Sequence, residues 1–108
     1  MEIDVYQNRA MRSANGGTRR ENLLCRALGI AGEAGEVVDL VKKHVYHGHP
    51  EDRGQLAEEL GDVLWYVAVL AASQGISLRQ VALLNLEKLE KRYPGGFTEA
   101  DSRWRKEA

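Results

Sequence analysis

Residues 30–67, IAGEAGEVVDLVKKHVYHGHPEDRGQLAEELGDVLWYV, decide the fold of this 108-residue chain. Two short acidic motifs lie in this stretch, Glu33-Ala-Gly-Glu36 and Glu59-Leu-Gly-Asp62. Each holds two carboxylates three residues apart, and residues at i and i+3 share one face of a helix. The motifs are mirrored about the turn-like segment 46–50, Tyr-His-Gly-His-Pro. If the chain folds back there, both motifs reach the same height on facing helices, at about 1.5 Å per residue.

Four carboxylates at one height predict a cation site. Like charges within ~4–6 Å raise one another's pKa or require a cation to neutralise them. Oxygen-only ligation favours Mg2+, Mn2+ or Ca2+ over zinc, which prefers nitrogen and sulfur. The alternative is that the side chains are solvated charges on surface helices. A single acidic pair favours that alternative, whereas two pairs at matched height favour the cation site.

Apolar periodicity predicts four helices and almost no strand. The first spans roughly residues 3–13 and the second roughly 20–45, while the third starts after Pro50 with Asp52 as its N-cap. The fourth opens at Ser77 and is closed by Pro94-Gly-Gly. The second and third helices form a long antiparallel pair around the turn. The sequence therefore predicts an all-α, four-helix bundle-like subunit in a single domain, residues 1–108, with a polar tail beyond Phe97.

The third predicted helix indicates self-association, since residues 63–72 are apolar almost all the way round. A helix of that kind is buried on every side, and three neighbours of this length cannot surround it in one small chain. We expect a homo-oligomer, a dimer or larger. Gly29, Gly32, Gly35 and Gly61 each cost ~1 kcal/mol in a helix interior, so close approach of a helix backbone or a ligand is expected beside the carboxylates, with plain helix packing as the alternative.

Whole-chain composition excludes few functions. The net charge is −1, from 15 basic and 16 acidic residues, so bulk charge predicts neither a nucleic-acid nor a membrane partner. The amino terminus lacks the features of a signal peptide, and the longest uncharged apolar run, residues 63–72, is far shorter than the ~20 residues of a membrane span. A single cysteine, Cys25, suits a reducing compartment and is expected to be a small buried residue. We expect a soluble, cytoplasmic protein.

Three segments together resemble the signature of the MazG-like nucleoside triphosphate pyrophosphohydrolases. They are GIAGEAGEVVDLVKK (29–43), EELGDVLWY (58–66) and NLEKLEKRYP (85–94), and the likeness covers roughly residues 23–98. One ExxE motif would be a weak signal. An ExxE, a spacer of 22 residues, an ExxD and a downstream Asn-to-Arg-Tyr-Pro block in this order form a specific pattern. The superfamily is all-helical and includes dimeric dUTPases and dCTP pyrophosphatases.

The resemblance implies a Mg2+-dependent hydrolase, with Mn2+ as a substitute, that splits a nucleoside triphosphate into the monophosphate and pyrophosphate. It implies that the metal-binding catalytic residues are Glu33, Glu36, Glu59 and Asp62. It also implies that the fourth-helix residues lie near the nucleotide: Asn85, Lys88, Arg92 and Tyr93. Several relatives have another Glu directly before the first motif, where this chain has Gly32, so the number of metal ions stays open.

The residues themselves agree with this chemistry. Magnesium held by a few carboxylates keeps waters and binds phosphate oxygens, so the acidic cluster recruits a polyanion that it would otherwise repel. One of Lys42 and Lys43, which follow the first motif by two turns, is expected to face the phosphates, and Lys43 is our candidate. The polar stripe on the fourth helix either reaches triphosphate oxygens or is a solvated face paired with neighbouring Glu residues. Trp65 and Tyr66 either stack on the base or, as aromatic residues in an apolar helix usually do, belong to the core.

Other interpretations remain open at this point. A non-catalytic helical oligomer that binds Mg-nucleotide as a sensor or regulator would use the same ligands. A ferritin-like di-iron bundle needs Glu-x-x-His motifs, and neither acidic motif ends in His. The histidines of the turn, His44, His47 and His49, match no standard zinc spacing and are expected to be loop residues. The preferred base or sugar, and the choice between dimer and tetramer, are not specified by the sequence.

Overall fold

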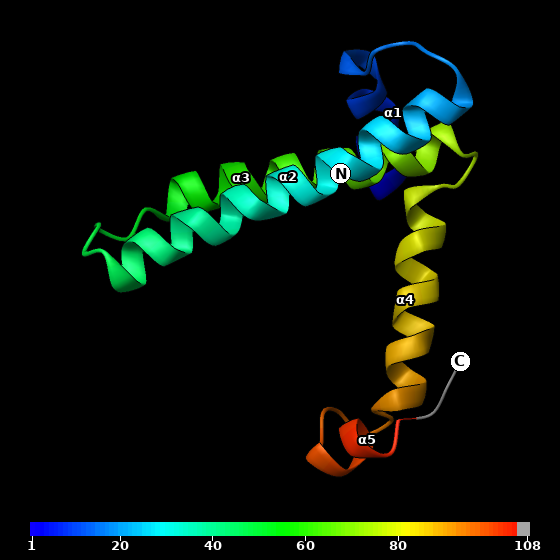
Figure 1. Cartoon of the computed structure of the whole chain (residues 1–108). Coiled ribbons are helices and arrows are strands. Elements are labelled where there is room, and N and C mark those ends of the chain that lie inside the picture. Colours follow the sequence, from blue (N-terminus) through cyan, green and yellow to red (C-terminus); the bar gives the residue numbers. More distant parts are fainter. Residues whose placement is uncertain (106–108) are drawn as a thin grey trace.

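The computed structural model describes residues 1–105 and shows an all-helical chain (Figure 1). Its elements are, in order, α1 (Ile3–Ala10), the 3-10 helix η1 (Met11–Ser13), α2 (Arg19–Tyr46), α3 (Arg53–Ser73), α4 (Leu78–Arg92) and α5 (Glu99–Arg103). The described residues contain no strand beyond one isolated bridge between Pro94 and Gly96. The all-α prediction is confirmed, and the last three residues of the predicted domain lie outside the described part.

Short polar side chains set where the helices begin. Thr18 and Glu21 form a capping box at the start of α2, in which each side chain accepts a hydrogen bond from the other residue's backbone N–H. Asp52 and Ser77 each accept a hydrogen bond from the backbone N–H three residues on, at the predicted starts of α3 and α4. Thr98 does the same for α5, a five-residue helix that the sequence prediction missed.

The long antiparallel pair is formed by α2 and α3, which lie side by side (Figure 1). The chain reverses through Gly48, whose φ of +72° is the left-handed conformation that glycine adopts without strain. The His49 backbone N–H donates to the Lys43 carbonyl oxygen at 3.1 Å and closes the end of α2. The turn lies where the sequence predicted it, so the two acidic motifs come to face each other.

One of the helical glycines allows close contact between these helices. A Cβ on Gly29 would overlap the aromatic ring of Tyr66 on α3. Gly32, Gly35 and Gly61 have open space where a Cβ would lie. Close approach therefore accounts for one glycine of the four, and the other three have no neighbour among the described residues that requires them.

The core is small and lies where α1, α3 and α4 meet. Its buried apolar residues are Ala10, Ala68, Val69 and Leu78. The predicted apolar run 63–72 is buried mainly in its second half, since Leu64 remains 44% exposed while Ala68 and Val69 are fully buried. Burial of the whole run inside one chain is therefore not observed.

A buried glutamine joins the three helices of this core. Gln7 on α1 donates from its Nε2 to the carbonyl oxygens of Ala68 and Ile76, both at 3.0 Å. Its Oε1 accepts the backbone N–H of Leu78 at 2.9 Å, the first residue of α4. Because the buried N–H of Leu78 in the first turn of α4 has no partner within its own helix, this side chain fixes where α4 starts.

The direction of α4 corrects the bundle prediction. After a turn at Gly75, whose φ is +73°, α4 departs from the axis of α3 by a bend of 107°. It therefore projects away from the α2–α3 pair rather than packing along it (Figure 1). Four apolar side chains of α4 remain exposed: Leu83, Leu84, Leu86 and Leu89. The single chain is a helical hairpin with a projecting arm, not a four-helix bundle, because periodicity gives an apolar face but not its partner.

Two further observations concern the surface. Cys25 is exposed in the chain, so the prediction that it is buried is wrong for the isolated subunit. Among the described residues no single helix is long and apolar enough to cross a membrane; only α3 and α4 taken together meet the length and composition criteria, and they are bent by 107°.

Candidate metal centre

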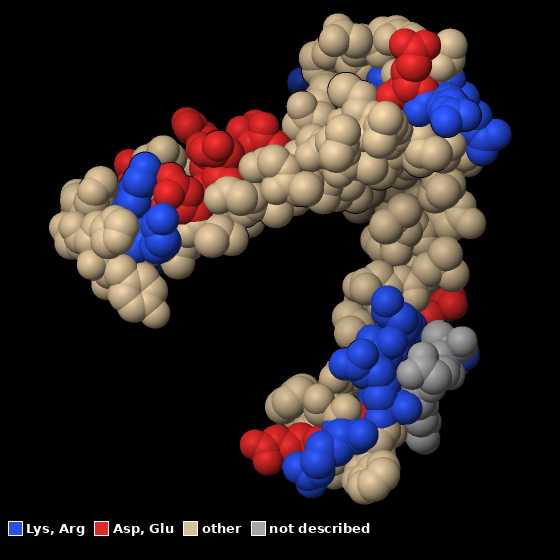
Figure 2. Space-filling view, viewed as in Figure 1, with Lys and Arg blue, Asp and Glu red and all other residues tan. Residues whose placement is uncertain are grey.

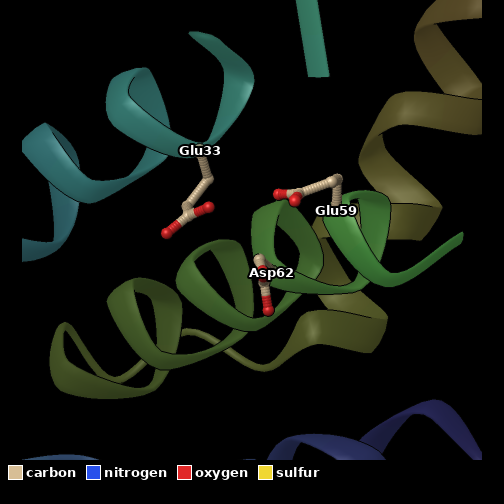
Figure 3. Close-up of side chains that lie close together, drawn as sticks. All are labelled: Glu33, Glu59 and Asp62. Carbon is tan, nitrogen blue, oxygen red and sulfur yellow. The ribbon is translucent and has the colours of Figure 1, made fainter. Parts of the chain in front are cut away.

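Three acidic side chains converge where α2 and α3 face each other (Figure 3). Glu33 extends from α2, and Glu59 and Asp62 extend from α3. A carboxylate oxygen of each lies within 4.8 Å of those of the other two. Glu33 and Glu59 are half-buried, and Asp62 is exposed. The mirrored motifs therefore bring three of the four predicted ligands together.

The fourth predicted ligand, Glu36, borders this group without joining it. Residues three apart on a helix are offset by about 60° around the axis and about 4.5 Å along it. This offset displaces Glu36 from Glu33 toward the tip of the hairpin. Glu36 and Glu59 both line a cavity of about 230 Å³ on that side. The acidic side chains gather on this part of the α2–α3 hairpin in Figure 2.

The carboxylates disfavour one another's ionisation. Partial desolvation raises the pKa of Glu59 above its ordinary value, and the charges of Asp62, Glu36 and Glu33 raise it further. Removing the repulsion requires either a proton or a cation. The group is therefore arranged so that a bound cation would stabilise the ionised carboxylates.

The donor set fits a hard divalent cation. The converging atoms are carboxylate oxygens, and no histidine or cysteine joins such a group within residues 1–105. Magnesium and manganese prefer oxygen ligands, and magnesium is commonly held by a few carboxylates together with substrate phosphates and water. Of the turn histidines, His47 and His49 lie in the loop after α2, whereas His44 lies in the last turn of α2, so the loop prediction is wrong for His44. The His44 Nδ1 lies 2.7 Å from the His49 carbonyl oxygen.

Lys43 lies beside the acidic group but already has a partner. Its Nζ is 2.8 Å from a carboxylate oxygen of Asp39, and the Lys42 Nζ lies 3.7 Å from the other oxygen. The hydrogen bond from Lys43 lowers the pKa of Asp39 below its ordinary value. Lys43 lines the same cavity as Glu36, together with Asp39 and Glu59.

The fourth-helix residues are not brought to this centre within one chain. Asn85, Lys88 and Arg92 lie on α4, which projects away from the α2–α3 pair, and Tyr93 follows its last residue (Figure 1). The Tyr93 ring packs against Phe97, with centroids 5.3 Å apart. Basic side chains gather toward the far end of α4 in Figure 2, well separated from the acidic group in the same view. Within a single subunit, the fourth-helix residues and the acidic group of the predicted site therefore lie apart.

The aromatic pair on α3 serves the fold. The Trp65 Nε1 donates to the Ala10 carbonyl oxygen at 3.1 Å and to the Ser13 Oγ at 3.0 Å. The Tyr66 ring lies against Gly29 and meets the Trp65 ring edge-on, with centroids 4.9 Å apart. These contacts agree with the core interpretation of both residues.

Sequence reasoning overlooked the contribution of α1 to this region. Tyr6 lies close enough to Asp62 that, after the larger effect of burial, the carboxylate charge raises the pKa of Tyr6. A cavity of about 440 Å³ opens beside it, lined also by Arg9, Arg12 and Trp65. The sequence of α1 carried no motif that pointed to this position.

The chain is an all-helical hairpin in which carboxylates from both helices converge in a group that could hold a divalent cation. The MazG nucleotide pyrophosphohydrolase domain matches residues 22–97, which include most of α2 and all of α3 and α4. This chain therefore belongs to the MazG nucleotide pyrophosphohydrolase family.

Similar proteins include phage, bacterial and mammalian members. The Gene 37 protein of Mycobacterium phage L5 is 37% identical over 105 residues, covering 89% of this chain and 92% of the relative. The dCTP pyrophosphatase 1 of Bos taurus is 36% identical over 73 residues, covering 62% of this chain and 43% of the relative. The human dCTP pyrophosphatase 1 is 32% identical over 82 residues, covering 70% of this chain and 48% of the relative. The chain thus spans less than half of these mammalian relatives, and no solved structure matches it at comparable significance.

Proposed function

We propose that this protein hydrolyses a nucleoside or deoxynucleoside triphosphate to the monophosphate and pyrophosphate in a Mg2+-dependent reaction, with Mn2+ able to substitute. The family match supports a nucleotide pyrophosphohydrolase. The observation that carries the metal assignment is the convergence of Glu33, Glu59 and Asp62 from two facing helices.

The chain's own residues position the reactants. Glu33, Glu59 and Asp62 would hold the metal, and Glu36 would join them by a change of side-chain rotamer, since it already borders the group. A metal held there would supply Lewis-acid chemistry, activating a water and polarising phosphate oxygens. Water would attack the α-phosphorus and lose a proton to solvent, the bond from that phosphorus to the oxygen that bridges it to the β-phosphorus would break, and pyrophosphate would leave with that oxygen. The half-buried position of Glu33 and Glu59 limits competition from bulk water at these oxygens.

A second copy of the chain would complete the site, as a dimer or tetramer. The apolar leucines exposed on α4 need a partner, and the Arg92 Nε is buried without a hydrogen-bond partner among the described residues. The basic end of one α4 and the acidic centre of another subunit are complementary in charge. In such an assembly Asn85, Lys88, Arg92 and Tyr93 would bind substrate alongside Lys43. The absence of nucleic-acid and membrane partners and the cytoplasmic location remain predictions from the sequence.

The substrate panel should begin with dCTP, because four mammalian relatives are named dCTP pyrophosphatase 1. Pyrophosphate release from common ribonucleoside and deoxynucleoside triphosphates is measured with Mg2+, with Mn2+ and after chelation. We expect release from at least one nucleotide, dependent on the metal. If no nucleotide releases pyrophosphate, the proposed hydrolase activity is refuted, and a nucleotide-binding sensor becomes the better interpretation.

The decisive variant is Glu59→Gln, which removes one charge from the acidic group while preserving shape. Glu58→Gln is the matched control, because it removes the same charge one residue away, about 100° around the helix axis and outside the converging group. We expect Glu59→Gln to reduce kcat at least about 100-fold and Glu58→Gln to retain most activity. Equal effects of the two variants would contradict the metal assignment.

A further inference from the structure

A second cavity lies beside the acidic centre, between α1, η1 and α3. Its volume is about 440 Å³, and Tyr6, Arg9, Arg12 and Trp65 are among its lining residues. Nothing in the family match covers α1 or η1, which precede residue 22. The α1 and η1 residues of this cavity are therefore additional to the acidic and fourth-helix motifs, whereas Trp65 lies within the matched residues.

The cavity lies about one helical turn along α3 from the acidic centre, although none of the three converging carboxylates lines it. Trp65, which lines the cavity, follows Asp62 by three residues on α3, so the two side chains share a face of that helix. A ligand held by the carboxylate group would have to extend about one helical turn, ~5 Å, along α3 to reach this space.

The charged side chains that line the cavity are two exposed guanidiniums, and Met1 lines it as well. Arg9 and Arg12 line it, no carboxylate does, and neither arginine has an ion-pair partner within residues 1–105. Arg9 makes only a long contact from Nη1 to the Met1 sulfur, at 3.9 Å. Guanidinium groups carry donors and no acceptors, and they bind phosphate oxygens in a forked geometry. The chemistry of the lining suits an anion.

A nucleobase is a poorer fit. The indole N–H of Trp65 is already used by the Ala10 carbonyl oxygen and the Ser13 hydroxyl, so it offers no donor to a base edge. A neutral base would leave two positive charges uncompensated. By contrast, the bond broken in the proposed reaction leaves growing negative charge on pyrophosphate, and fixed positive groups beside it would stabilise that charge.

We propose that Arg9 and Arg12 form the subsite for the β- and γ-phosphates and hold the pyrophosphate as it leaves. This inference rests on the proposed function and gives the triphosphate a direction: its β- and γ-phosphates lie toward α1. Arg9 and Arg12 are substrate-binding residues in this role, and α1 becomes part of the site.

The test measures binding of magnesium pyrophosphate by calorimetry, without turnover. The variants are Arg9→Met, Arg12→Met and the double substitution, since methionine keeps the aliphatic stem and removes the charge. Arg20→Met is the matched control, because Arg20 is exposed and lines none of the cavities described above. Binding of the common deoxynucleoside monophosphates in the presence of Mg2+ is measured in parallel.

We expect each arginine substitution to weaken pyrophosphate binding about tenfold, from the loss of a charge-assisted hydrogen bond, with monophosphate binding and Arg20→Met unchanged. Loss of monophosphate binding with pyrophosphate binding intact would overturn the inference and assign the cavity to the nucleoside. Unchanged binding of both, or a wild type that does not bind magnesium pyrophosphate, would also overturn it. A wild type that binds magnesium pyrophosphate through these arginines but hydrolyses no nucleotide would support the subsite and refute the proposed activity alone.

Discussion

Replacing Gln7 with methionine should destabilise the protein strongly, although the side chain lies outside every acidic motif. Gln7 is only 6% exposed and makes three hydrogen bonds of 2.9–3.0 Å to α3, the turn after it and α4. Methionine has a similar volume and removes all three bonds. With each bond contributing about 1 kcal/mol net, and with the buried Leu78 N–H left without its acceptor, the loss is about 3–4 kcal/mol.

The assay is urea unfolding followed by circular dichroism, at matched protein concentration because the stability of an oligomer depends on concentration. A loss of this size corresponds to a fall in Tm of about 12 °C or more for a domain of this length. Asn8→Ala is the control, since Asn8 is exposed on the same helix; its stability should stay within about 0.5 kcal/mol. A change below about 1 kcal/mol for Gln7→Met would refute the conclusion that this side chain anchors α4.

Three further predictions follow from separate contacts. Gly29→Ala should destabilise the helical pair because its Cβ meets an aromatic ring, whereas Gly32→Ala, in open space, should stabilise it by up to about 1 kcal/mol; thermal melts that rank the two alike would contradict this. Since the Lys43 hydrogen bond lowers the pKa of Asp39, the associated stabilisation is present above the ordinary pKa of the carboxyl and is lost as pH falls through the lowered value; NMR titration should show this midpoint move upward in Lys43→Met. Leu84→Glu, on the exposed apolar face of α4, should shift the mass measured by light scattering toward the monomer, and a monomeric wild type at micromolar concentration would sink the oligomer proposal.

The local structure followed the sequence closely. The capping residues Asp52 and Ser77 were readable, as was the turn around Gly48, because they act through neighbours a few residues away. Their positions fixed the register of the α2–α3 pair. The meeting of Glu33 with Asp62 then followed from helix rise alone.

The candidate site was predictable only in part. Residues three apart on a helix differ by about 60° around its axis, and this rotation separates Glu36 from the converging group. The spacing of the motif alone does not show which of its two side chains joins that group. The pairing of Lys43 with Asp39 was likewise absent from the prediction. This i to i+4 pair competes with any ligand for the Lys43 ammonium group. Arg9 and Arg12 share a cavity with Trp65 only because α1 packs against α3.

The sequence by itself determined that this chain is helical, where its long hairpin turns, and that carboxylates from two helices meet, because each of these depends on periodicity and counting along one pair of elements. Only the tertiary structure decided that α4 leaves the pair, that Gln7 anchors its start, and that α1 packs against α3 with arginines lining the cavity between them. The physical reason is that an apolar stripe specifies which face of a helix must be covered, while the packing of several elements at once decides what covers it.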